Sequence, residues 1–532
     1  MLRDCSRNCH GIDCADPLHR LLLALAILAL ISLGLAQATF GAFLSRTGAE
    51  SVVGADDAYI SFRYAKNIFD GLGAVYNAGE RVEGYSNPLF VLLTVPGFWV
   101  VGPDAIYWWS VALNSVFMAA TLLVLYGVTR RAAGPHAGAA AAVVFALNPV
   151  MWAWLGAGLE TPMVLWLQLC IWAVTLSSPS AARDRRLWIL AVAAVVARPD
   201  GFIVPVAVAA HEYWRGHRSS AIRVAVAIVI ATAVMTGWRL LYYGDALPNT
   251  YYAKITGPIG WRVLSAAKQL LTVGGPSGLL VLIGVLGALP FVSTASTPRD
   301  RVPLSTVIAA VLLSYWAYVG GDVFDERFLL VIFPLGTHEA FRLLSMHAPA
   351  LRPAVAALAL VVVQAGTLGH NDDRFSYAAA RYDMWTTLGQ RLREESPGAV
   401  LAIDAAGKVP YVSGLRTIDM LGLTNRTIAR SSSKGRQIGH AKYCPDYVLA
   451  QQPDLIAAWV GPANLDLLWG LTHDLYTAHG YKLKYLVNAS RAPEFDSEGR
   501  DANVIDVTDI PPIQLAELLA RNYRYAVLAR VR

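Results

Sequence analysis

The sequence predicts an α-helical membrane bundle of about eleven spans, followed by a C-terminal α/β domain on the outer side of the membrane. The chain has 532 residues, of which 55% are hydrophobic and only 15% are charged, whereas soluble proteins carry about 25% charged residues. Long apolar runs recur up to residue 368, and charged residues become frequent from about residue 370. We therefore predict a cytoplasmic tail (1–20), a transmembrane domain (21–369) and an extracytoplasmic α/β domain (370–532).

Nine apolar runs are candidate membrane spans, because a bilayer core needs roughly 20 apolar residues per helix. The first run is too long for a signal-peptide core, and no small-residue cleavage pattern follows it, so it predicts an uncleaved helix. The nine runs are 21–43, 105–128, 136–154, 162–176, 221–242, 277–292, 303–319, 328–344 and 353–368.

The stretch 187–210 is ambiguous, since Arg198-Pro199-Asp200-Gly201 lies at its middle. A single helix would bury two charges at mid-bilayer, at about 2.5–3.5 kcal/mol each. Two short helices could instead turn at Pro-Asp-Gly. With a hairpin and an inner N-terminus every inner loop is rich in arginine, as the positive-inside rule requires. We therefore predict the hairpin and an outer C-terminus.

Two further regions complete the predicted fold. The apolar stretch 89–101 is too short to span, so it predicts a re-entrant or interfacial helix in the first outer loop, 45–104. Beyond residue 370, strands alternate with helices over about 160 residues, enough for a separate core. The predicted strands are 399–403, 416–420, 453–459 and 524–529, and the predicted helices are 378–395 and 512–522.

Polar clusters fall between spans on the predicted outer side. Carboxylates can activate or orient a hydroxyl, and arginine or lysine can hold a phosphate. Such a set at one membrane surface suits chemistry on a lipid-borne phosphate. The candidate residues are Asp56, Asp57, Arg63, Glu83, Tyr85, Asn87, Glu160, Arg198, Asn249, Tyr251, Lys254, Asp322, Glu326 and Arg327.

Each cluster also has a structural explanation. Asp56 and Asp57 could merely favour a helix start, and Arg198 with Asp200 could be an ion pair in a turn. Asn249 could serve turn chemistry, and the acids around Arg327 could form a solvated loop. No cofactor is indicated, although a divalent metal at Asp56 and Asp57 stays open.

The net charge of +6 fits positive-inside loops and anionic lipid, and we expect no nucleic-acid partner. The sequence has neither a GxxxxGK[ST] phosphate loop nor a GxGxxG segment after a strand. A site on the outer face would have no access to cytosolic nucleotide sugars. Location alone therefore predicts a lipid-carried donor.

The stretches Asp56-Asp57-Ala58-Tyr59-Ile60-Ser61-Phe62-Arg63 and Glu83-Gly84-Tyr85-Ser86-Asn87-Pro88 resemble the first outer loop of GT-C glycosyltransferases. The similarity is to a bacterial branch that includes the actinobacterial arabinofuranosyltransferases, and it covers residues 45–340. Four later segments resemble the same branch: Gly-Leu-Glu-Thr-Pro, Arg-Pro-Asp-Gly, Leu-Pro-Asn-Thr-Tyr-Tyr-Ala-Lys and Gly-Gly-Asp…Glu-Arg-Phe. The basic start of the family's first loop has no lysine here, so phosphate contacts are not carried over to it.

The resemblance implies a GT-C bundle in the bacterial inner membrane, a polyprenyl-phosphate sugar donor and a glycan, lipid or protein acceptor outside the cytoplasm. It implies that Asp56 or Asp57 is the general base. Donor phosphate and sugar would lie against the loops 245–254 and 322–327, with Arg198 beside them. Arg63, Glu83, Tyr85, Asn87 and Glu160 would lie on the acceptor side. Arabinofuranose is the leading sugar, with hexoses and aminoarabinose open.

Two other classes of function stay open from the sequence. One is a transporter or flippase for lipid-linked sugars, although transporters place ionisable groups near the midplane. The other is a non-catalytic assembly partner of the cell envelope. Replacing Asp56 and Asp57 would abolish transfer, whereas transport or assembly should largely survive.

Overall fold

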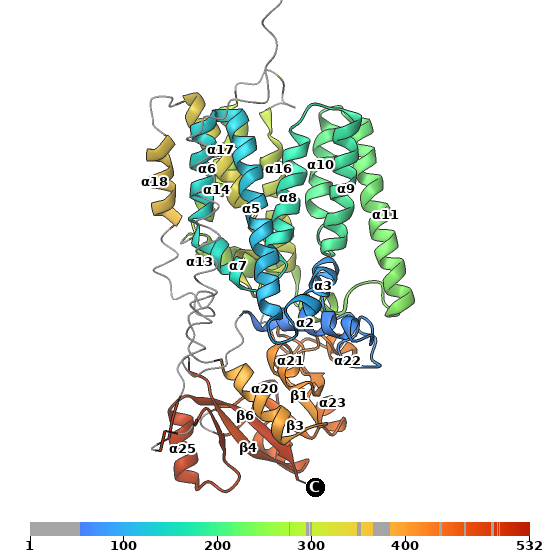
Figure 1. Cartoon of the computed structure of the whole chain (residues 1–532), viewed down its shortest axis with the longest axis vertical. Coiled ribbons are helices and arrows are strands. Elements are labelled where there is room, and N and C mark those ends of the chain that lie inside the picture. Colours follow the sequence, from blue (N-terminus) through green and yellow to red (C-terminus); the bar gives the residue numbers. More distant parts are fainter. Residues whose placement is uncertain are drawn as a thin grey trace, which may run out of the picture.

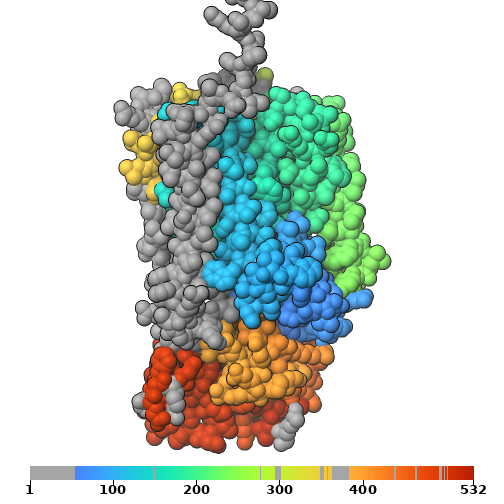
Figure 2. All heavy atoms as spheres, viewed as in Figure 1, coloured from blue at the N-terminus to red at the C-terminus, as the bar shows by residue number. Residues whose placement is uncertain are grey.

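The computed structural model places a helical bundle on top of a mixed sheet, with helix α2 (Asp56–Phe69) lying between them (Figure 1). The predicted tail and first span lie outside the described residues. In the space-filling view the C-terminal residues abut the α2 region directly (Figure 2). The structure describes residues 54–531 except 276, 294–296, 298–300, 348–352, 365–382, 436–438, 462–463, 491–493, 497 and 500.

The predicted apolar runs within the described residues are helical. By length and composition, α5 and α11 could each cross a membrane, and counting each of two bent helix pairs as one span raises the number to four. The count of eleven spans stays a prediction. The bundle helices are α5 (Ile106–Ala133), α6 (Pro135–Ala146), α7 (Pro149–Gly156), α8 (Thr161–Thr175), α9 (Ala181–Ala197), α10 (Ile203–Trp214), α11 (Arg218–Tyr242), α13 (Ile259–Gly274), α14 (Leu279–Val292), α16 (Leu304–Val319), α17 (Ile332–His347) and α18 (Pro353–Gln364).

The ambiguous stretch 187–210 is a helical hairpin, as predicted. Helix α9 ends at Ala197 and α10 begins at Ile203, and the chain reverses between them (Figure 1). Gly201 is required at this turn, because a Cβ there would lie 1.8 Å from the Ala194 carbonyl oxygen. The turn therefore needs its glycine.

Three segments differ from their predicted form. The run 136–154 is not one helix, because α6 ends at Ala146 and Asn148 then caps α7 by accepting from the Val150 N–H (2.9 Å). The two helices are bent by 59°. The run 328–344 starts as a 3-10 turn, η1 (Asp325–Leu329), before α17. Helix α13 was not predicted, since it is amphipathic rather than uniformly apolar.

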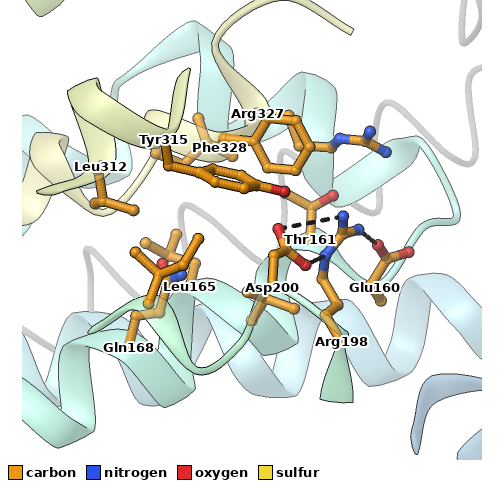
Figure 3. A pocket seen from close by; sticks show the side chains of 13 residues that line it. Glu160, Thr161, Leu165, Gln168, Arg198, Asp200, Leu312, Tyr315, Arg327 and Phe328 are labelled. Carbon is orange, nitrogen blue, oxygen red and sulfur yellow. Dashed lines mark hydrogen bonds and ion pairs between the residues drawn. The ribbon is translucent and has the colours of Figure 1, made fainter. Parts of the chain in front are cut away.

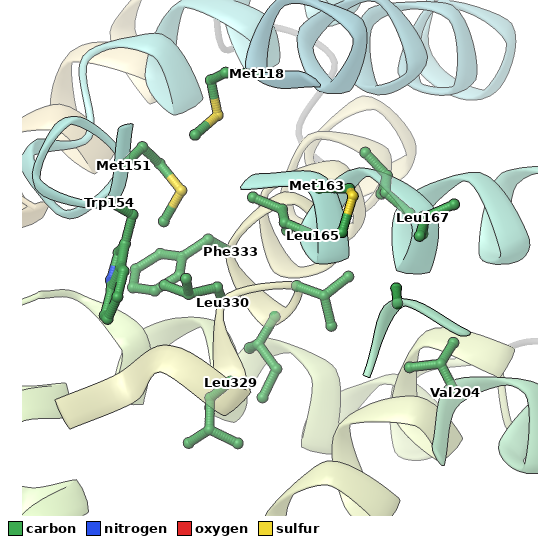
Figure 4. Packing of buried hydrophobic residues seen from close by; sticks show 14 of the residues in the cluster. Met118, Met151, Trp154, Met163, Leu165, Leu167, Val204, Leu329, Leu330 and Phe333 are labelled. Atoms are coloured by element: carbon green, nitrogen blue, oxygen red, sulfur yellow. The ribbon is translucent and has the colours of Figure 1, made fainter. Parts of the chain in front are cut away.

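Short helices lie at the end of the bundle that carries α2. The stretch 89–101 forms α3 (Pro88–Thr94) and α4 (Gly97–Val100) rather than one helix, and α12 (Asn249–Lys254) follows α11. Apolar side chains from α5, α7, α8 and α10 pack against Leu329, Leu330 and Phe333 (Figure 4). This packing fixes the segment that carries the predicted acidic loop.

Residues 383–531 form an α/β unit around a six-stranded sheet with the order β2-β1-β3-β6-β4-β5. The four predicted strands are present, whereas β4 and β5 were not predicted. Strands β2, β1 and β3 are parallel, and β6, β4 and β5 add antiparallel pairs. The strands are β1 (Val400–Ile403), β2 (Arg416–Asp419), β3 (Leu455–Trp459), β4 (Tyr481–Asn488), β5 (Val504–Asp506) and β6 (Tyr523–Arg530).

Helices cover both faces of this sheet, and two separate clusters of buried apolar side chains lie on its faces. The carboxyl ends of β2, β1 and β3 share one edge because the three strands are parallel. The segment that follows β1 contacts the start of α2. The helices are α20 (Met384–Glu395), α21 (Lys408–Ser413), α22 (Arg426–Ala429), α23 (Pro445–Ala450), α24 (His473–Ala478) and α25 (Pro512–Ala520).

Candidate active site

Asp56 attaches the α/β unit to α2. Its two carboxylate oxygens accept the backbone N–H groups of Gly407 (3.0 Å) and Lys408 (2.7 Å), just after β1. Burial raises the pKa of Asp56 to about 7; the Lys408 N–H opposes this shift, and the charge of Asp57 adds to it. Both oxygens are therefore engaged with backbone when the acid is ionised.

Asp57, the second residue of α2, is more open. Its side chain is 31% exposed, and its Oδ2 lies 4.0 Å from Nζ of Lys254, at the end of α12. A negative charge at this position interacts favourably with the N-terminal end of the α2 dipole. Of the acid pair, Asp57 thus has the geometry of a base that can take a proton from a substrate.

The cationic cleft lies on the bundle side of Asp57 and encloses about 720 Å³. The predicted donor-side residues line it, with the exception of Asn249 and Glu326. Its lining residues include Ser86, Arg198, Asp200, Thr250, Tyr251, Lys254, Tyr315, Gly321, Asp322, Arg327 and Phe328.

The two arginines of the cationic cleft are already paired. Arg327 donates from Nε (2.7 Å) and Nη2 (3.0 Å) to the Asp322 carboxylate. Arg198 donates from Nε to Asp200 (2.8 Å) and from Nη1 to Glu160. Figure 3 shows this second group, with the ring of Phe328 above it. The charges of Arg198 and Arg327 are thus largely neutralised by their acid partners. Lys254 has a looser contact, since its Nζ lies 4.0 Å from Oδ2 of Asp57.

A buried hydrogen-bond chain links the first loop to this cleft. Ser61 donates to Asn87 Oδ1 (3.1 Å), and Asn87 donates from Nδ2 to Glu160 Oε2 (2.8 Å). Glu160 then accepts from Arg198. The chain brings together three residues that the sequence placed in separate loops, and it holds Arg198 in position.

Two predicted site residues connect the bundle to the α/β unit instead. Arg63 donates to the carbonyls of Pro410 (2.7 Å) and Leu415 (2.8 Å). Asn249 donates to the carbonyl of Gly422 (2.7 Å). Neither side chain lines a cleft described here, so their contacts are structural.

Three further candidates lie away from both clefts. Glu83 pairs with Arg239 of α11 (Oε2 to Nε, 2.8 Å), and the hydroxyl of Tyr85 lies 3.1 Å from that of Tyr243. Glu326 is buried within η1. The first two contacts brace the first loop against the end of α11.

The aromatic cleft lies on the other side of Asp57, against the α/β unit, and encloses about 1150 Å³. Sequence reasoning missed its C-terminal residues, although an acid directly after a parallel strand was a usable signal. Its lining residues are Asp56, Asp57, Ile60, Phe324, Trp385, Asp404, Ala405, Ala406, Leu421, Leu423, His440, Trp459, Leu468 and Trp469.

The acid pair offers little to a protein-held metal. Among the described residues, no group of three or more His, Cys, Asp or Glu side chains is placed to hold an ion. Asp56 is occupied by backbone N–H groups, so a cation here would have Asp57 as its protein ligand. Substrate phosphate and water would supply the other oxygens, as is common for Mg²⁺.

Comparisons with known proteins address the fold and the relatives. The crystal structure of ArnT from Cupriavidus metallidurans bound to undecaprenyl phosphate aligns with a TM-score of 0.55 at 12% identity, over 97% of this chain and 99% of that chain. The Archaeoglobus fulgidus oligosaccharyltransferase tethered to an acceptor peptide gives 0.54 at 12% identity, over 94% and 75%.

Sequence relatives cover parts of the chain. The terminal β-(1→2)-arabinofuranosyltransferase of Mycobacterium tuberculosis (strain ATCC 25618 / H37Rv) is 30% identical over 231 residues, which are 39% of this chain and 36% of that protein. The match thus spans about a third of the relative's length. Residues 374–525 match a domain of unknown function (DUF8728). The fold of the chain is that of ArnT and of the oligosaccharyltransferase, as its first-loop motifs predicted.

Proposed function

We propose that the chain is a membrane glycosyltransferase that moves a sugar from a polyprenyl-phosphate donor to an acceptor hydroxyl outside the cytoplasm. The observation that carries this proposal is the position of Asp57. Its carboxylate lines the aromatic cleft and lies 4.0 Å from Lys254, which lines the cationic cleft. Transfer between two substrates needs a base that lies between them. Asp57 lies between the cationic cleft, which can bind the donor phosphate, and the aromatic cleft, which can bind the acceptor.

The reaction is a single displacement at the anomeric carbon. Asp57 accepts the proton of the acceptor hydroxyl while the acceptor oxygen forms a bond to the anomeric carbon. The bond from that carbon to the donor phosphate oxygen breaks, and the lipid phosphate leaves with the electron pair. One base suffices, and attack opposite to the leaving group inverts the anomeric configuration.

Lys254 stabilises the leaving phosphate in this mechanism. Its side chain is 31% exposed and lines the cationic cleft. Positive charge aimed at the developing phosphate charge is usually a large contribution to catalysis. Arg198 and Arg327 set the shape and field of the cleft through their acid partners, and Tyr251 and Asp322 line the remaining wall.

The relatives support the substrate classes. ArnT was crystallised with undecaprenyl phosphate, which supports a polyprenyl-phosphate donor. The arabinofuranosyltransferase match supports arabinofuranose as the sugar and the cell envelope as the setting. We place the chain in the bacterial inner membrane, with the α/β unit and both clefts on the outer side.

Purified protein supplied with polyprenyl-phosphoryl arabinofuranose as donor and an arabinofuranosyl oligosaccharide as acceptor tests the proposal. Mass analysis should detect free polyprenyl phosphate and a product heavier by one pentose. Asp57→Asn should lose at least about a hundredfold in rate, the usual contribution of a general base, whereas Asp70→Asn at the C-cap of α2 should keep full activity. A near-normal rate in folded Asp57→Asn would remove this base from the mechanism.

The sugar and the reaction class are tested separately. Polyprenyl-phosphoryl hexose or aminoarabinose should be used more slowly than arabinofuranose. A faster reaction with one of them would change the sugar but keep the transferase. Absence of turnover with every lipid phosphosugar, in protein that is folded and monodisperse, would contradict the proposed function itself.

A further inference from the structure

We propose that the aromatic cleft is the acceptor subsite and that its ligand is a glycan, whose sugar rings lie against Trp459 and Trp469. This inference rests on the proposed function and adds the class of acceptor and the residues that bind it. The cleft opens between α2 and the carboxyl edge of the parallel strands.

The sheet topology places a binding site at this edge. In the sheet, β1 lies between β2 and β3, the two strands that follow it in sequence. The chain therefore leaves β1 toward one side for β2 and returns to its other side for β3. In open α/β sheets, ligands bind outside the carboxyl ends of the strands at such a switch point. Asp404 directly follows β1, Trp459 ends β3, and Leu421 follows β2; all three line the cleft.

The aromatic rings are held in fixed orientations. Trp385, Trp459 and Tyr525 pack edge to face, with centroid separations of 4.7 to 6.1 Å. The rings of His440 and Trp469 are nearly parallel, with an interplanar angle of 25° and centroids 5.9 Å apart. Ordered rings present a rigid surface at low entropic cost, which suits the C–H face of a sugar ring.

Asp404 positions the indole of Trp469. One oxygen accepts the indole N–H (2.8 Å) and the other accepts the hydroxyl of Tyr525 (2.7 Å). The backbone of Trp469 has a φ of 68°, in the left-handed region that bulky residues rarely adopt. A strained tryptophan kept in a half-open cleft by a buried acid indicates a binding role.

The two clefts meet around Asp57. Two pairs of neighbouring residues lie between the clefts. Gly439 and Val323 line the cationic cleft, whereas the residues that follow them, His440 and Phe324, line the aromatic cleft. A glycan on the tryptophans would therefore present a hydroxyl to Asp57 next to the donor phosphate at Lys254.

The lining chemistry favours a glycan over the other acceptor classes. An acyl chain would require a continuously apolar groove, but three carboxylates, those of Asp56, Asp57 and Asp404, line this one. The aromatic faces can pack against the C–H faces of a ligand, and the carboxylate oxygens can accept hydrogen bonds from its hydroxyl groups. A glycan has both C–H faces and many hydroxyl groups. A peptide or lipid acceptor is the competing outcome of the test.

Binding is measured first, by saturation-transfer NMR of an arabinofuranosyl oligosaccharide with the full chain in detergent and no donor present. Wild type should give sugar-ring signals, and Trp469→Ala should reduce them at least fivefold. Trp469→Phe keeps the ring without the N–H bond to Asp404 and should fall between. Trp99→Ala, an exposed tryptophan on α4 outside both clefts, is the control and should match wild type.

Kinetics then separates acceptor from donor binding. Trp469→Ala should raise the KM for the oligosaccharide at least tenfold but change the KM for the donor less than twofold, and the control Trp99→Ala should match wild type in both. The subsite is overturned if wild type does not bind the oligosaccharide, if a peptide or lipid replaces it as acceptor, or if Trp469→Ala raises the donor KM as much as the acceptor KM. Because the binding arm needs no donor, failure of the proposed transfer reaction does not decide it.

Discussion

At the residue scale, the two neighbouring acids have different environments and therefore different tasks. Both oxygens of Asp56 accept backbone N–H groups from residues 407 and 408. Asp57 lines the aromatic cleft and lies 4.0 Å from Lys254, which lines the cationic cleft. The family resemblance did not decide which of the two acids is the general base. The contacts favour Asp57 as the base and Asp56 as the residue that positions the α/β unit.

Asp56 should give transfer a dependence on pH near neutrality. Burial, followed by the opposing Lys408 N–H and the charge of Asp57, leaves the pKa of Asp56 at about 7, with Lys408 and Asp383 also facing it. Only the ionised form accepts both N–H groups, so kcat/KM should fall as the pH drops through about 7. A pH–rate profile checks this.

Asp56→Asn provides the diagnostic comparison for that profile. An amide can accept only one of the two N–H groups, so its activity should be low and flat across the range where wild type changes. Asp70→Asn should retain the wild-type profile. An unchanged acid limb in Asp56→Asn would assign the titration to another group.

Lys254 and Arg327 should respond differently to substitution. Lys254→Met removes the cation that faces the donor phosphate, so the KM for donor should rise at least tenfold while the melting temperature stays within about 2 °C. Arg327→Lys loses the two-fold contact with Asp322, so it should cost about 1.5–3 kcal/mol in stability. Donor titration and thermal unfolding separate the two effects.

The reverse pattern would return the phosphate-binding role to Arg327. In that case Arg327→Lys would weaken donor use at unchanged stability, and Lys254→Met would leave the donor KM unaltered. Arg198 is a poorer candidate, since Glu160 and Asp200 both occupy its guanidinium.

At the element scale, the contact between α2 and the segment after β1 determines the distance between the clefts. Gly407 makes this approach: a Cβ there would lie 1.9 Å from the Asp56 carbonyl oxygen and 2.7 Å from its Cγ. Gly407→Ala must push the segment away from α2. A displacement of about 1 Å can cost on the order of a hundredfold in rate, which the transfer assay would show.

Gly435→Ala is the matched control, because Ala441 Cα, at 4.0 Å, is the nearest atom recorded around its added Cβ. Hydrogen exchange should rise in residues 404–411 of Gly407→Ala and stay at wild-type level in Gly435→Ala. Full activity of Gly407→Ala would mean that this contact does not set the site geometry.

At the scale of the whole molecule, charge and architecture support one orientation in the membrane. Arginines are concentrated where α5 ends, where α9 begins and between α10 and α11, and these points share the end of the bundle opposite α2 (Figure 1). The positive-inside rule then places α2 and the α/β unit outside.

A reporter fusion checks this orientation. Alkaline phosphatase, which is active only outside the cytoplasm, should work when fused after Arg532 and fail when fused after Gly134, between α5 and α6. Activity of a cytoplasm-only reporter after Arg532 would reverse the sidedness and place both clefts on the inner face.

The sequence by itself determined the features that depend on local composition. Apolar runs predict helices wherever their length matches a bilayer, and the arginine distribution, together with the Pro-Asp-Gly turn, predicts the hairpin. Short apolar runs predicted β1, β2, β3 and β6, whereas β4 and β5 were missed. The contiguous first-loop motifs predicted the fold and named the acid pair as candidate site residues.

Only the tertiary structure decided which distant side chains meet. Arg63 and Asn249 looked like site residues in their loops, yet their partners are carbonyls of the α/β unit. Trp469, in an irregular loop without a motif, lies in the same cleft as Asp57. The physical reason is that hydrogen bonds and ring packing depend on distance in space, and the close approach of Gly407 to α2 brings these segments together.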